Sequence, residues 1–407
     1  MPVYLSPGVY VEEVPGVPPI TGVGTSTAAF IGEVDISVVN PDGSAFGMPF
    51  RPGRPLDPAN PVPADFYDVT PINSPQLITS WSQFMTKFGD FQAGNNVLAH
   101  AVYGFFNNGG TACFVTRVTD AADVAQIQAA LLLLEPIDEI AIVAVPGALD
   151  PGAQTAVIDH CAKMKDRFAI IDGQRTTTIS ANAIQGAGLS DSNFAALYFP
   201  WLKVFDPVTK ADPTTKGLIF VPPSGHMAGV YARVDAERGV HKAPANVTPR
   251  GVLGLEYLTS KNEQDLLNPK GINVIRNLNG NIKVWGARTL GGDDNGEFKY
   301  INVRRLMLFL AESIDEGTQF VVFEPNNPAL WQRITRSVTA FLTNVWRSGA
   351  LFGLTPEEAF YVKCDETTNP PDVRELGQVV TEIGVAIVKP AEFVIFRITQ
   401  LTGLESL

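Results

Sequence analysis

The most regular pattern of apolar and polar positions lies in the last third of the chain. Apolar residues recur at helical spacing over residues 300–314 and 327–348, and the apolar run 319–323 between them predicts a buried strand. At about 100° per residue, one stripe of the second helix is continuously apolar: Leu330, Trp331, Ile334, Val338, Phe341, Leu342, Val345 and Trp346. We therefore expect the strongest hydrophobic core near the end of the chain.

The second helix also has clear end signals and a distinctive polar face. Asn326 and Asn327 both suit the N-cap, Pro328 suits the first turn and Gly349 suits the stop. Opposite the apolar stripe lie three arginines, Arg333, Arg336 and Arg347, and no Asp or Glu occurs from residue 326 to 348. Such a face on an acidic chain indicates a docking surface for an acidic partner. A solvated helix back accounts for the same charges equally well.

The middle of the chain alternates between helices and short apolar strands. Helices are expected over residues 81–88, 97–106, 121–134, 151–165 and 226–238. Strands are expected over residues 113–118, 137–145 and 168–171, with strand-like segments at 193–205 and 217–221. This alternation predicts a largely parallel sheet with helices on both faces. A helix over 261–267 and strands over 272–277 and 282–285 follow in the last third.

The first 75 residues are rich in proline and contain one expected buried strand. A buried strand is expected over residues 25–34. Residues 41–75 then contain nine prolines, which is typical of a linker or an irregular surface crossing. We therefore place a domain boundary at this segment, and we expect residues 76–240 to form one inserted α/β domain.

Both ends of the chain contain strand patterns that have no partner nearby in the sequence. Residues 9–14 have the pattern of a strand and lie between Pro7 and Pro15. At the other end, an expected strand over 378–388 is followed, after Pro390, by an alternating strand over 392–401. Such strands must pair with a distant segment or with another molecule. The residues expected to pair are Val9, Tyr10, Val11, Glu12 and Val14 at one end, and Phe393, Val394, Ile395, Phe396 and Ile398 at the other.

Composition and charge narrow the class of protein. The chain has 407 residues, 45% hydrophobic and 18% charged, which leaves room for two or three globular domains. A net charge of −12 disfavours a general nucleic-acid binder. No apolar run is long enough to predict a membrane span, and the first residues do not resemble a secretory signal. Three separated cysteines fit folding in a reducing cytoplasm: Cys113, Cys161 and Cys364.

The sequence contains no convincing set of catalytic residues. A phosphate-binding loop and a nucleophile elbow are both missing, and none of the four histidines has metal-ligand spacing: His100, His160, His226 and His241. Asp293 and Asp294 in a glycine-rich loop could bind Ca²⁺, but a plain turn is the favoured interpretation. We expect no catalytic residue, cofactor or metal. An α/β enzyme or ligand-binding protein that uses the middle domain stays open as an alternative.

Five motifs, in this order, resemble the tail sheath family of contractile phage tails and related injection systems. They are P-G-V-Y-V-E-E-V-P (7–15), G-V-G-T-S-T-A-A-F-I-G (22–32), H-K-A-P-A-N (241–246), V-W-G-A-R-T-L (284–290) and E-F-V-I-F-R-I (392–398). The resemblance covers both ends and about the last 170 residues. The chain is compact beside larger phage sheaths, as are the sheaths of R-type tailocins and extracellular injection particles.

The resemblance implies a fold and a domain order. An α+β core domain would combine both ends of the chain, and an inserted α/β domain would face outward. The expected segments are an N-terminal arm (1–24), a first core part with the proline-rich crossing (25–75), the inserted domain (76–240), the core sheath domain (241–377) and C-terminal strands that form a second arm (378–407).

The resemblance also implies partners and a mechanism. The chain would form hexameric rings, stacked helically around an inner tube protein, with the terminal strands adding to a neighbour's sheet. By order in the chain, the helix over 327–348 would face the tube through Arg333, Arg336 and Arg347. Baseplate and tail-terminator or cap proteins would be further partners, without nucleic acid or membrane insertion. The particle would assemble in the cytoplasm and work without a nucleotide. A tail tube or baseplate component is an alternative, whose signature would be a small β-barrel.

Overall fold

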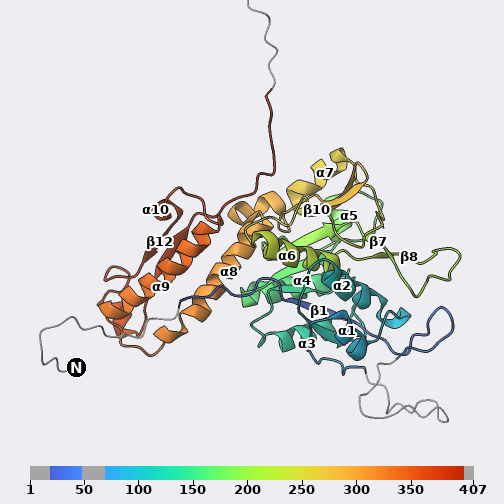
Figure 1. The fold of residues 1–407 in the computed structure, drawn as a ribbon, viewed down its shortest axis with the longest axis horizontal. Helices are drawn as coiled ribbons and strands as arrows, with labels where there is room; N and C mark the ends of the chain where they lie inside the picture. The colour runs from blue at the N-terminus through green and yellow to red at the C-terminus, as the bar shows by residue number, and fades with distance from the viewer. Residues whose placement is uncertain (1–18, 48–68, 398–407) are drawn as a thin grey trace, which may run out of the picture. The chain divides into compact units, whose positions relative to one another are not determined.

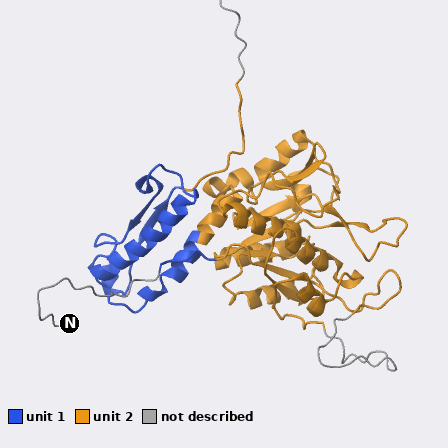
Figure 2. Ribbon diagram, in the orientation of Figure 1, with its two compact units in different colours: residues 1–23, 310–386 blue, residues 24–309, 387–407 orange. Residues whose placement is uncertain are grey.

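The chain divides into two compact units. A computed structural model describes residues 19–47 and 69–397. The smaller unit combines residues 1–23 with 310–386, and the larger combines residues 24–309 with 387–407 (Figure 2).

The larger unit is built on one eight-stranded sheet of order β11-β10-β6-β5-β4-β1-β3-β2. Figure 1 labels β1 and β10 of this sheet. Six central strands run parallel, and β2 and β11 are antiparallel at the two edges. The largely parallel sheet expected from the sequence is therefore confirmed. The strands are β1 (Ala28–Glu33), β2 (Gln76–Ile78), β3 (Cys113–Val118), β4 (Ile142–Ala144), β5 (Phe168–Asp172), β6 (Ala195–Phe199), β10 (Ile272–Leu278) and β11 (Asn281–Val284).

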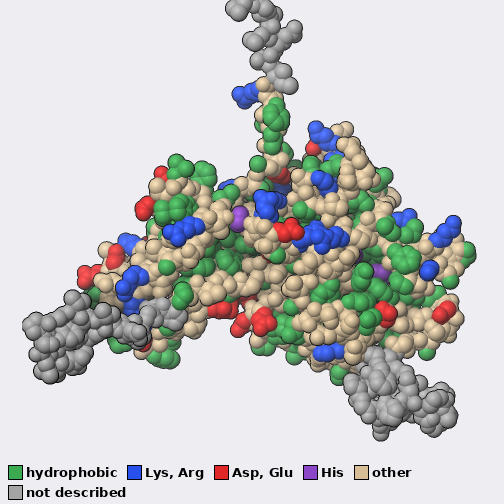
Figure 3. Space-filling model, in the orientation of Figure 1, with side chains coloured by type: hydrophobic (Ala, Val, Ile, Leu, Met, Phe, Trp, Pro, Cys, Tyr) green, Lys and Arg blue, Asp and Glu red, His purple; other side chains and the backbone are tan. Residues whose placement is uncertain are grey.

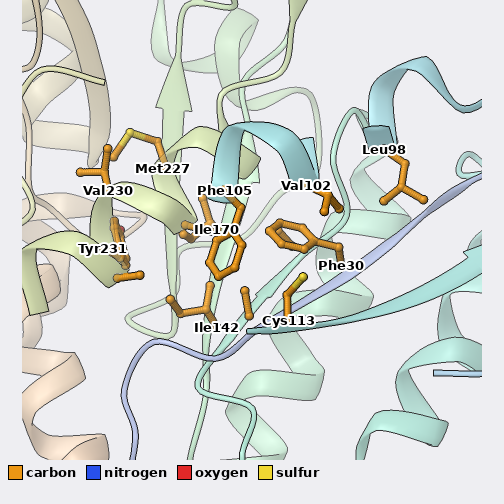
Figure 4. Close-up of a cluster of buried hydrophobic side chains, with 14 of the residues drawn as sticks. Phe30, Leu98, Val102, Phe105, Cys113, Ile142, Ile170, Met227, Val230 and Tyr231 are labelled. Atoms are coloured by element: carbon orange, nitrogen blue, oxygen red, sulfur yellow. The ribbon is translucent and has the colours of Figure 1, made fainter. Parts of the chain in front are cut away.

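Helices cover both faces of this sheet. Successive strand residues point to opposite faces, so Phe30 of β1 joins one hydrophobic cluster and Ile31 the other. The first cluster includes Phe105 of α2 and Tyr231 of α6 (Figure 4), and the second includes side chains of α3 and α4. The helices of this unit are α1 (Trp81–Phe88), α2 (Asn96–Asn107), α3 (Val124–Leu134), α4 (Pro151–Met164), α5 (Ala181–Gln185), α6 (Ser224–Arg238) and α7 (Lys261–Leu267).

Helices α2 and α6 approach each other through glycine. A Cβ atom at Gly225 would lie 2.3 Å from Cα of Ala101, and one at Gly229 would lie 2.4 Å from the carbonyl oxygen of Phe105. Real Cβ atoms do not approach backbone atoms this closely. The two helices can therefore pack at this distance only because these positions have no side chain.

A small antiparallel sheet of three strands also belongs to the larger unit. It contains β7 (Leu202–Phe205), β8 (Leu218–Val221) and β9 (Gly254–Leu255), in the order β8-β7-β9. The strand-like segment expected over 193–205 is therefore two strands, β6 and β7, in two different sheets. A continuous apolar run does not show where a chain passes from one sheet to another.

The smaller unit pairs a long amphipathic helix with a two-stranded sheet. Helix α8 (Ile301–Gly317) begins in the larger unit and ends in the smaller one. Helix α9 (Pro328–Arg347) follows, and its N-cap Asn327 accepts a hydrogen bond from the backbone N–H of Leu330 at 3.0 Å, as the sequence predicts. The remaining elements are α10 (Pro356–Ala359), β12 (Phe360–Lys363), α11 (Pro371–Glu375) and β13 (Glu382–Val385).

The buried strand expected over residues 319–323 is wrong. Residues Gln319–Val321 form a short 3₁₀ helix, and Val322 and Phe323 are exposed on the surface. An apolar run of five residues has no periodicity that distinguishes a buried strand from a surface turn. The most apolar stretch between α8 and α9 is therefore outside the core.

The compact units cut across the domain boundaries expected from the sequence. Strand β1 lies between β3 and β4, so residues 25–34 share a sheet with the segment expected to be inserted, 76–240. Strands β10 and β11 extend that same sheet beyond residue 240. Strands that are distant in the sequence can be neighbours in a parallel sheet, and a composition change such as the proline-rich segment carries no information on that pairing.

The terminal strands differ from expectation as well. Only Glu382–Val385 of the expected strand 378–388 is a strand, and residues 391–397 form none. The expected strand over 9–14 lies outside the described residues, as does Ile398.

Candidate assembly surfaces

Glu392 anchors the C-terminal segment to the larger unit. Its carboxylate accepts hydrogen bonds from Nε and Nη2 of Arg288 at 2.8 and 2.9 Å, from Nδ2 of Asn268 at 2.7 Å, and from the hydroxyl of Tyr300 at 2.9 Å. The Arg288 side chain is 4% exposed and that of Glu392 is 19% exposed. We call these four residues the clasp. It holds the chain at the last position before the exposed segment 393–397.

The clasp favours the ionised form of Glu392. Burial by itself would raise the pKa of this carboxyl group. The hydrogen bonds from Arg288, Asn268 and Tyr300 outweigh burial and leave the pKa of Glu392 below its usual value. The carboxylate is therefore charged at neutral pH, which makes its bidentate pairing with Arg288 a charge-assisted one.

The clasp brings together motifs that are far apart in the sequence. Arg288 belongs to V-W-G-A-R-T-L and Glu392 to E-F-V-I-F-R-I, and a cavity of about 880 Å³ is lined by parts of both. The H-K-A-P-A-N loop lines the same cavity through Lys242, Ala243 and Asn246, among others. Asn302 of α8 fixes this loop and the C-terminal segment at once, because its Nδ2 donates to the carbonyl oxygens of His241 and Val388 at 2.8 and 3.4 Å. Three of the five motifs thus build one site, the root of the C-terminal segment.

The residues after the clasp are apolar and exposed. Phe393, Val394, Ile395 and Phe396 have 69, 69, 79 and 85% of their surface exposed. In Figure 3 this segment projects from the surface of its unit, and its first residues, Phe393 and Val394, also line the cavity at its root. Side chains of an extended segment alternate between two faces, so exposure of all four leaves both faces uncovered. We call residues 393–397 the exposed arm.

The smaller unit contains a sheet of only two strands. Strands β12 and β13 pair antiparallel over Phe360–Lys363 and Glu382–Val385, and no third described strand joins them. An isolated strand pair is marginally stable, and its free edges are templates for further pairing. Exposed apolar side chains of the same unit include Phe352 (74%), Leu354 (91%) and Tyr361 (58%). The sheet therefore has both the backbone edges and the apolar surface to accept another strand.

Helix α9 carries the three arginines on its exposed side. Its apolar stripe is buried as expected, from Leu330 to Val345. Arg336 and Arg347 are exposed, whereas Arg333 is partly covered. The arginine face of α9 has one acidic neighbour, although no acid lies within the helix. Nη1 of Arg333 lies 3.4 Å from Oε2 of Glu324, which precedes the helix. Arg336 and Arg347 are thus the more available cations.

Two family models match the chain. One describes the "Phage tail sheath protein central domain" and matches residues 120–290, and the other describes the "Phage tail sheath C-terminal domain" and matches residues 293–400. A chain from the structure of the anti-feeding prophage helical sheath in the contracted state is 30% identical, with a TM-score of 0.73, and the match covers 98% of this chain and 100% of that one. The chain belongs to the phage tail sheath family.

Two further relatives support this family membership. A chain from the contracted sheath of the extracellular contractile injection system PVC has a TM-score of 0.75 and 28% identity, and the match covers 99% of both chains. A prophage major tail sheath protein of Pseudomonas aeruginosa is 27% identical over 62% of this chain. The chain spans 63% of that relative's length, less than two thirds. The resemblance identified from the motifs is confirmed.

In this member of the sheath family, the carboxylate at the carboxyl end of β5, on the carboxyl edge of the sheet, is bonded to other groups of the chain. Asp172, at the end of β5, is buried and accepts hydrogen bonds from the backbone N–H groups of Gly147 (3.0 Å) and Ser224 (2.8 Å) and from the Ser224 hydroxyl (2.8 Å). Burial is the main reason why the pKa of Asp172 is raised to about 6. A ligand of an α/β enzyme would bind at this edge, so the enzyme alternative has no support from this carboxylate.

Other candidate chemistry of this sheath family member is also structural. Asp293 lies 3.1 Å from Arg288 and 3.2 Å from Lys299, and Asp294 lies 3.0 Å from Lys270. In the described residues, no group of three or more His, Cys, Asp or Glu side chains is arranged to hold a metal ion. No described helix combines the length and the apolar character needed to cross a membrane.

Proposed function

We propose that the chain is the structural subunit of a contractile tail sheath, which polymerises helically around an inner tube and contracts to drive the tube through a target envelope. The main observation behind the proposal is that the exposed arm follows directly after the clasp, which anchors the C-terminal segment to the larger unit. Four consecutive exposed apolar residues are typical of a surface that another molecule covers. The full-length likeness to sheaths in the contracted state supports the same role.

The exposed arm of one copy is proposed to add to the β12–β13 sheet of another. Backbone hydrogen bonds along a free strand edge would supply affinity, and the alternating side chains Phe393 to Phe396 would supply specificity. Residues 9–14, which have the same strand pattern, are proposed to act as the second arm. A head-to-tail contact that does not close on itself propagates into a helical filament. We propose that this filament consists of stacked hexameric rings, as the resemblance to the family implies.

Contraction then needs no enzymatic step. The extended sheath is proposed to be metastable and to be released by a signal from the baseplate. Subunits would rotate outward, contacts with the tube would break, and new contacts between sheath subunits would form. The arms would stay paired throughout, so the sheath would shorten without losing its subunits.

The exposed arginines of α9 are the proposed contact with an acidic inner tube. Exposed ion pairs contribute roughly 0–1 kcal/mol each, so several of them would hold the register of the sheath and still break on contraction. Baseplate and tail-terminator proteins are the further partners expected at the two ends. The particle is proposed to assemble in the cytoplasm, as part of a phage tail or a tail-like injection particle.

Charge in the exposed arm is expected to prevent polymerisation. Val394 and Phe396 lie on one face of an extended segment, and carboxylates placed there would have to be buried in the neighbour's sheet. The purified chain should form hollow striated tubes in negative-stain electron microscopy, and the variant with Val394→Asp and Phe396→Asp should stay a folded monomer. Leu132→Asp, at a 61% exposed position of α3, is the matched control and should still form tubes. Normal tubes from the arm variant would contradict the proposed arm.

Charge reversal on α9 is expected to separate tube binding from self-assembly. With Arg336→Glu and Arg347→Glu, the chain should still form sheath tubes alone but should no longer coat the inner tube, because like charges would face each other. The matched control reverses two exposed lysines in the loop between β7 and β8, Lys210→Glu and Lys216→Glu, and changes the net charge equally. Co-sedimentation with purified inner tubes gives the measurement. If both variants bind equally well, α9 is not the tube contact.

A further inference from the structure

The turn between α8 and α9 presents a fully exposed aromatic side chain. Phe323 is 103% exposed and Val322 is 57% exposed, although residues 319–323 are among the most apolar of the chain. The turn is ordered by local hydrogen bonds: the N–H groups of Val321, Val322 and Glu324 donate to the carbonyl oxygens of Thr318, Gln319 and Val321 at 2.9, 3.2 and 3.1 Å. Phe323 therefore points into solvent from a defined backbone.

The backbone at Phe323 is unfavourable for a bulky side chain. Val322 has φ −66° and ψ 131°, Phe323 has φ +66°, and Glu324 bonds back to Val321. These are the features of a type II turn, whose third position requires positive φ and is normally Gly or Asn. A large aromatic residue there is uncommon. Phe323 therefore contributes no buried surface to the fold, and its side chain does not suit the turn. A residue in such an unfavourable backbone conformation points to a function.

The turn is continuous with the arginine face of α9. The guanidinium of Arg333 lies 5.3 Å from the centre of the Phe320 ring, and its Nη1 lies 3.4 Å from the Glu324 carboxylate. Arg336 is one helical turn further along α9 and shares its side of the helix with Arg333. The turn that presents Phe323 is therefore joined to the arginine face through the contacts of Arg333 with Phe320 and Glu324.

We propose that Phe323 is an apolar anchor that inserts into a pocket of the inner tube, while Arg336 and Arg347 face carboxylates further along the tube surface. The proposal rests on the proposed tube contact of α9 and extends it to a second kind of contact. Ion pairs at an exposed rim steer and orient a partner, whereas a buried aromatic residue at the centre of an interface carries most of its affinity. A strained turn keeps the ring outside the subunit, where the tube can bind it.

The test separates a binding role from a structural one with a single substitution. Phe323→Gly removes the ring and places the preferred residue in the turn, so the unfolding temperature of the chain should stay the same or rise. Binding to purified inner tubes, measured by co-sedimentation below the concentration at which the chain polymerises alone, should weaken at least tenfold. Tube-free polymerisation should be unchanged. Leu132→Ala is the control, because it removes an exposed apolar side chain elsewhere on the chain. Alanine is used there and not glycine, because Leu132 lies inside helix α3.

Each other outcome overturns the inference in a distinguishable way. Unchanged tube binding by Phe323→Gly, together with lost binding by the charge-reversal variant of Arg336 and Arg347, would reject the anchor and retain the arginine contact. Unchanged binding by both variants would reject the tube contact of α9 as well. A fall in unfolding temperature would make Phe323 a structural residue. Lost polymerisation without tubes would mean that the turn contacts other copies of the chain.

Discussion

Replacing Glu392 with alanine is expected to release the C-terminal segment from the larger unit and to abolish sheath assembly, while the rest of the chain stays folded. The substitution removes four hydrogen bonds and leaves Arg288, whose side chain is 4% exposed, with Asp293 as its remaining carboxylate partner. Loss of one partner of a buried pair costs about 3–5 kcal/mol, and we expect the lower end because Glu392 is 19% exposed. About 3 kcal/mol is more than a hundredfold in the equilibrium that holds the segment.

Hydrogen exchange and electron microscopy check this expectation together. Amide exchange over residues 387–392 should become fast in the Glu392→Ala variant, and its solutions should contain no tubes. Lys389→Ala changes an exposed residue of the same segment and is the matched control. An unchanged exchange pattern in the glutamate variant would show that the clasp does not hold the segment, and normal tubes would show that the assembly does not need it.

The pH dependence of the clasp follows from the lowered pKa of Glu392. A carboxyl group whose pKa is lower in the folded chain contributes stability that is fully present above its unfolded value, about 4.3. This contribution is lost as the pH falls through the lower, folded value. Protection of residues 387–392 should therefore be the same at pH 7 and pH 5, and should decrease only in stronger acid. Glu392→Gln should remove this dependence.

Gly225→Ala is expected to cause a large loss of stability in the larger unit. The new Cβ would lie 2.3 Å from the backbone of Ala101, which cannot turn away as a side chain could. Overpacking of this kind costs about 1–3 kcal/mol, and a backbone clash belongs at the upper end. Ala is otherwise favoured over Gly in a helix by up to about 1 kcal/mol, so a net loss must come from the clash between α6 and α2.

Thermal unfolding measures this effect. In a large domain, each kcal/mol lowers the midpoint by about 2–4 °C, so Gly225→Ala should lower it by roughly 6–12 °C. Gly24→Ala is the control, because no atom lies within 4 Å of a Cβ built at Gly24 and its φ is not positive. An unchanged midpoint for Gly225→Ala would mean that α2 and α6 can move apart at little cost.

Local signals in the sequence predicted most helices and several strands. Helix α9 was predictable to within a residue or two, because Asn327, Pro328 and Gly349 mark its ends and its apolar stripe is continuous. Helices α1 and α7 and strand β3 have the expected limits. In each of these elements, the information lies within the element itself.

Pairing between distant segments was not predictable. Nothing in residues 28–33 shows that β1 is inserted between β3 and β4, which come later in the chain. The apolar run 319–323 was misassigned because its environment, not its composition, places it on the surface. The role of Glu392 could have been suspected only from a single acid at the start of an apolar segment, and its partners Asn268, Arg288 and Tyr300 have no common signal in the sequence.

The expected strand over residues 392–401 is a different case. Residues 391–397 have the alternation of a strand but no strand structure, because a strand is defined by hydrogen bonds to a neighbour. If the neighbour is another copy, a single chain cannot show the pairing. The proposed arms are therefore visible in one copy only as exposure.

The order of the clasp residues in the chain also determines when each is synthesised. Glu392 follows its partners Tyr300, Arg288 and Asn268 by 92, 104 and 124 residues. At about 5–20 residues per second, a ribosome needs roughly 5–20 s to travel from Arg288 to Glu392. All strands of the sheet in the larger unit are therefore synthesised before the exposed arm, and an unfinished subunit lacks the proposed C-terminal arm.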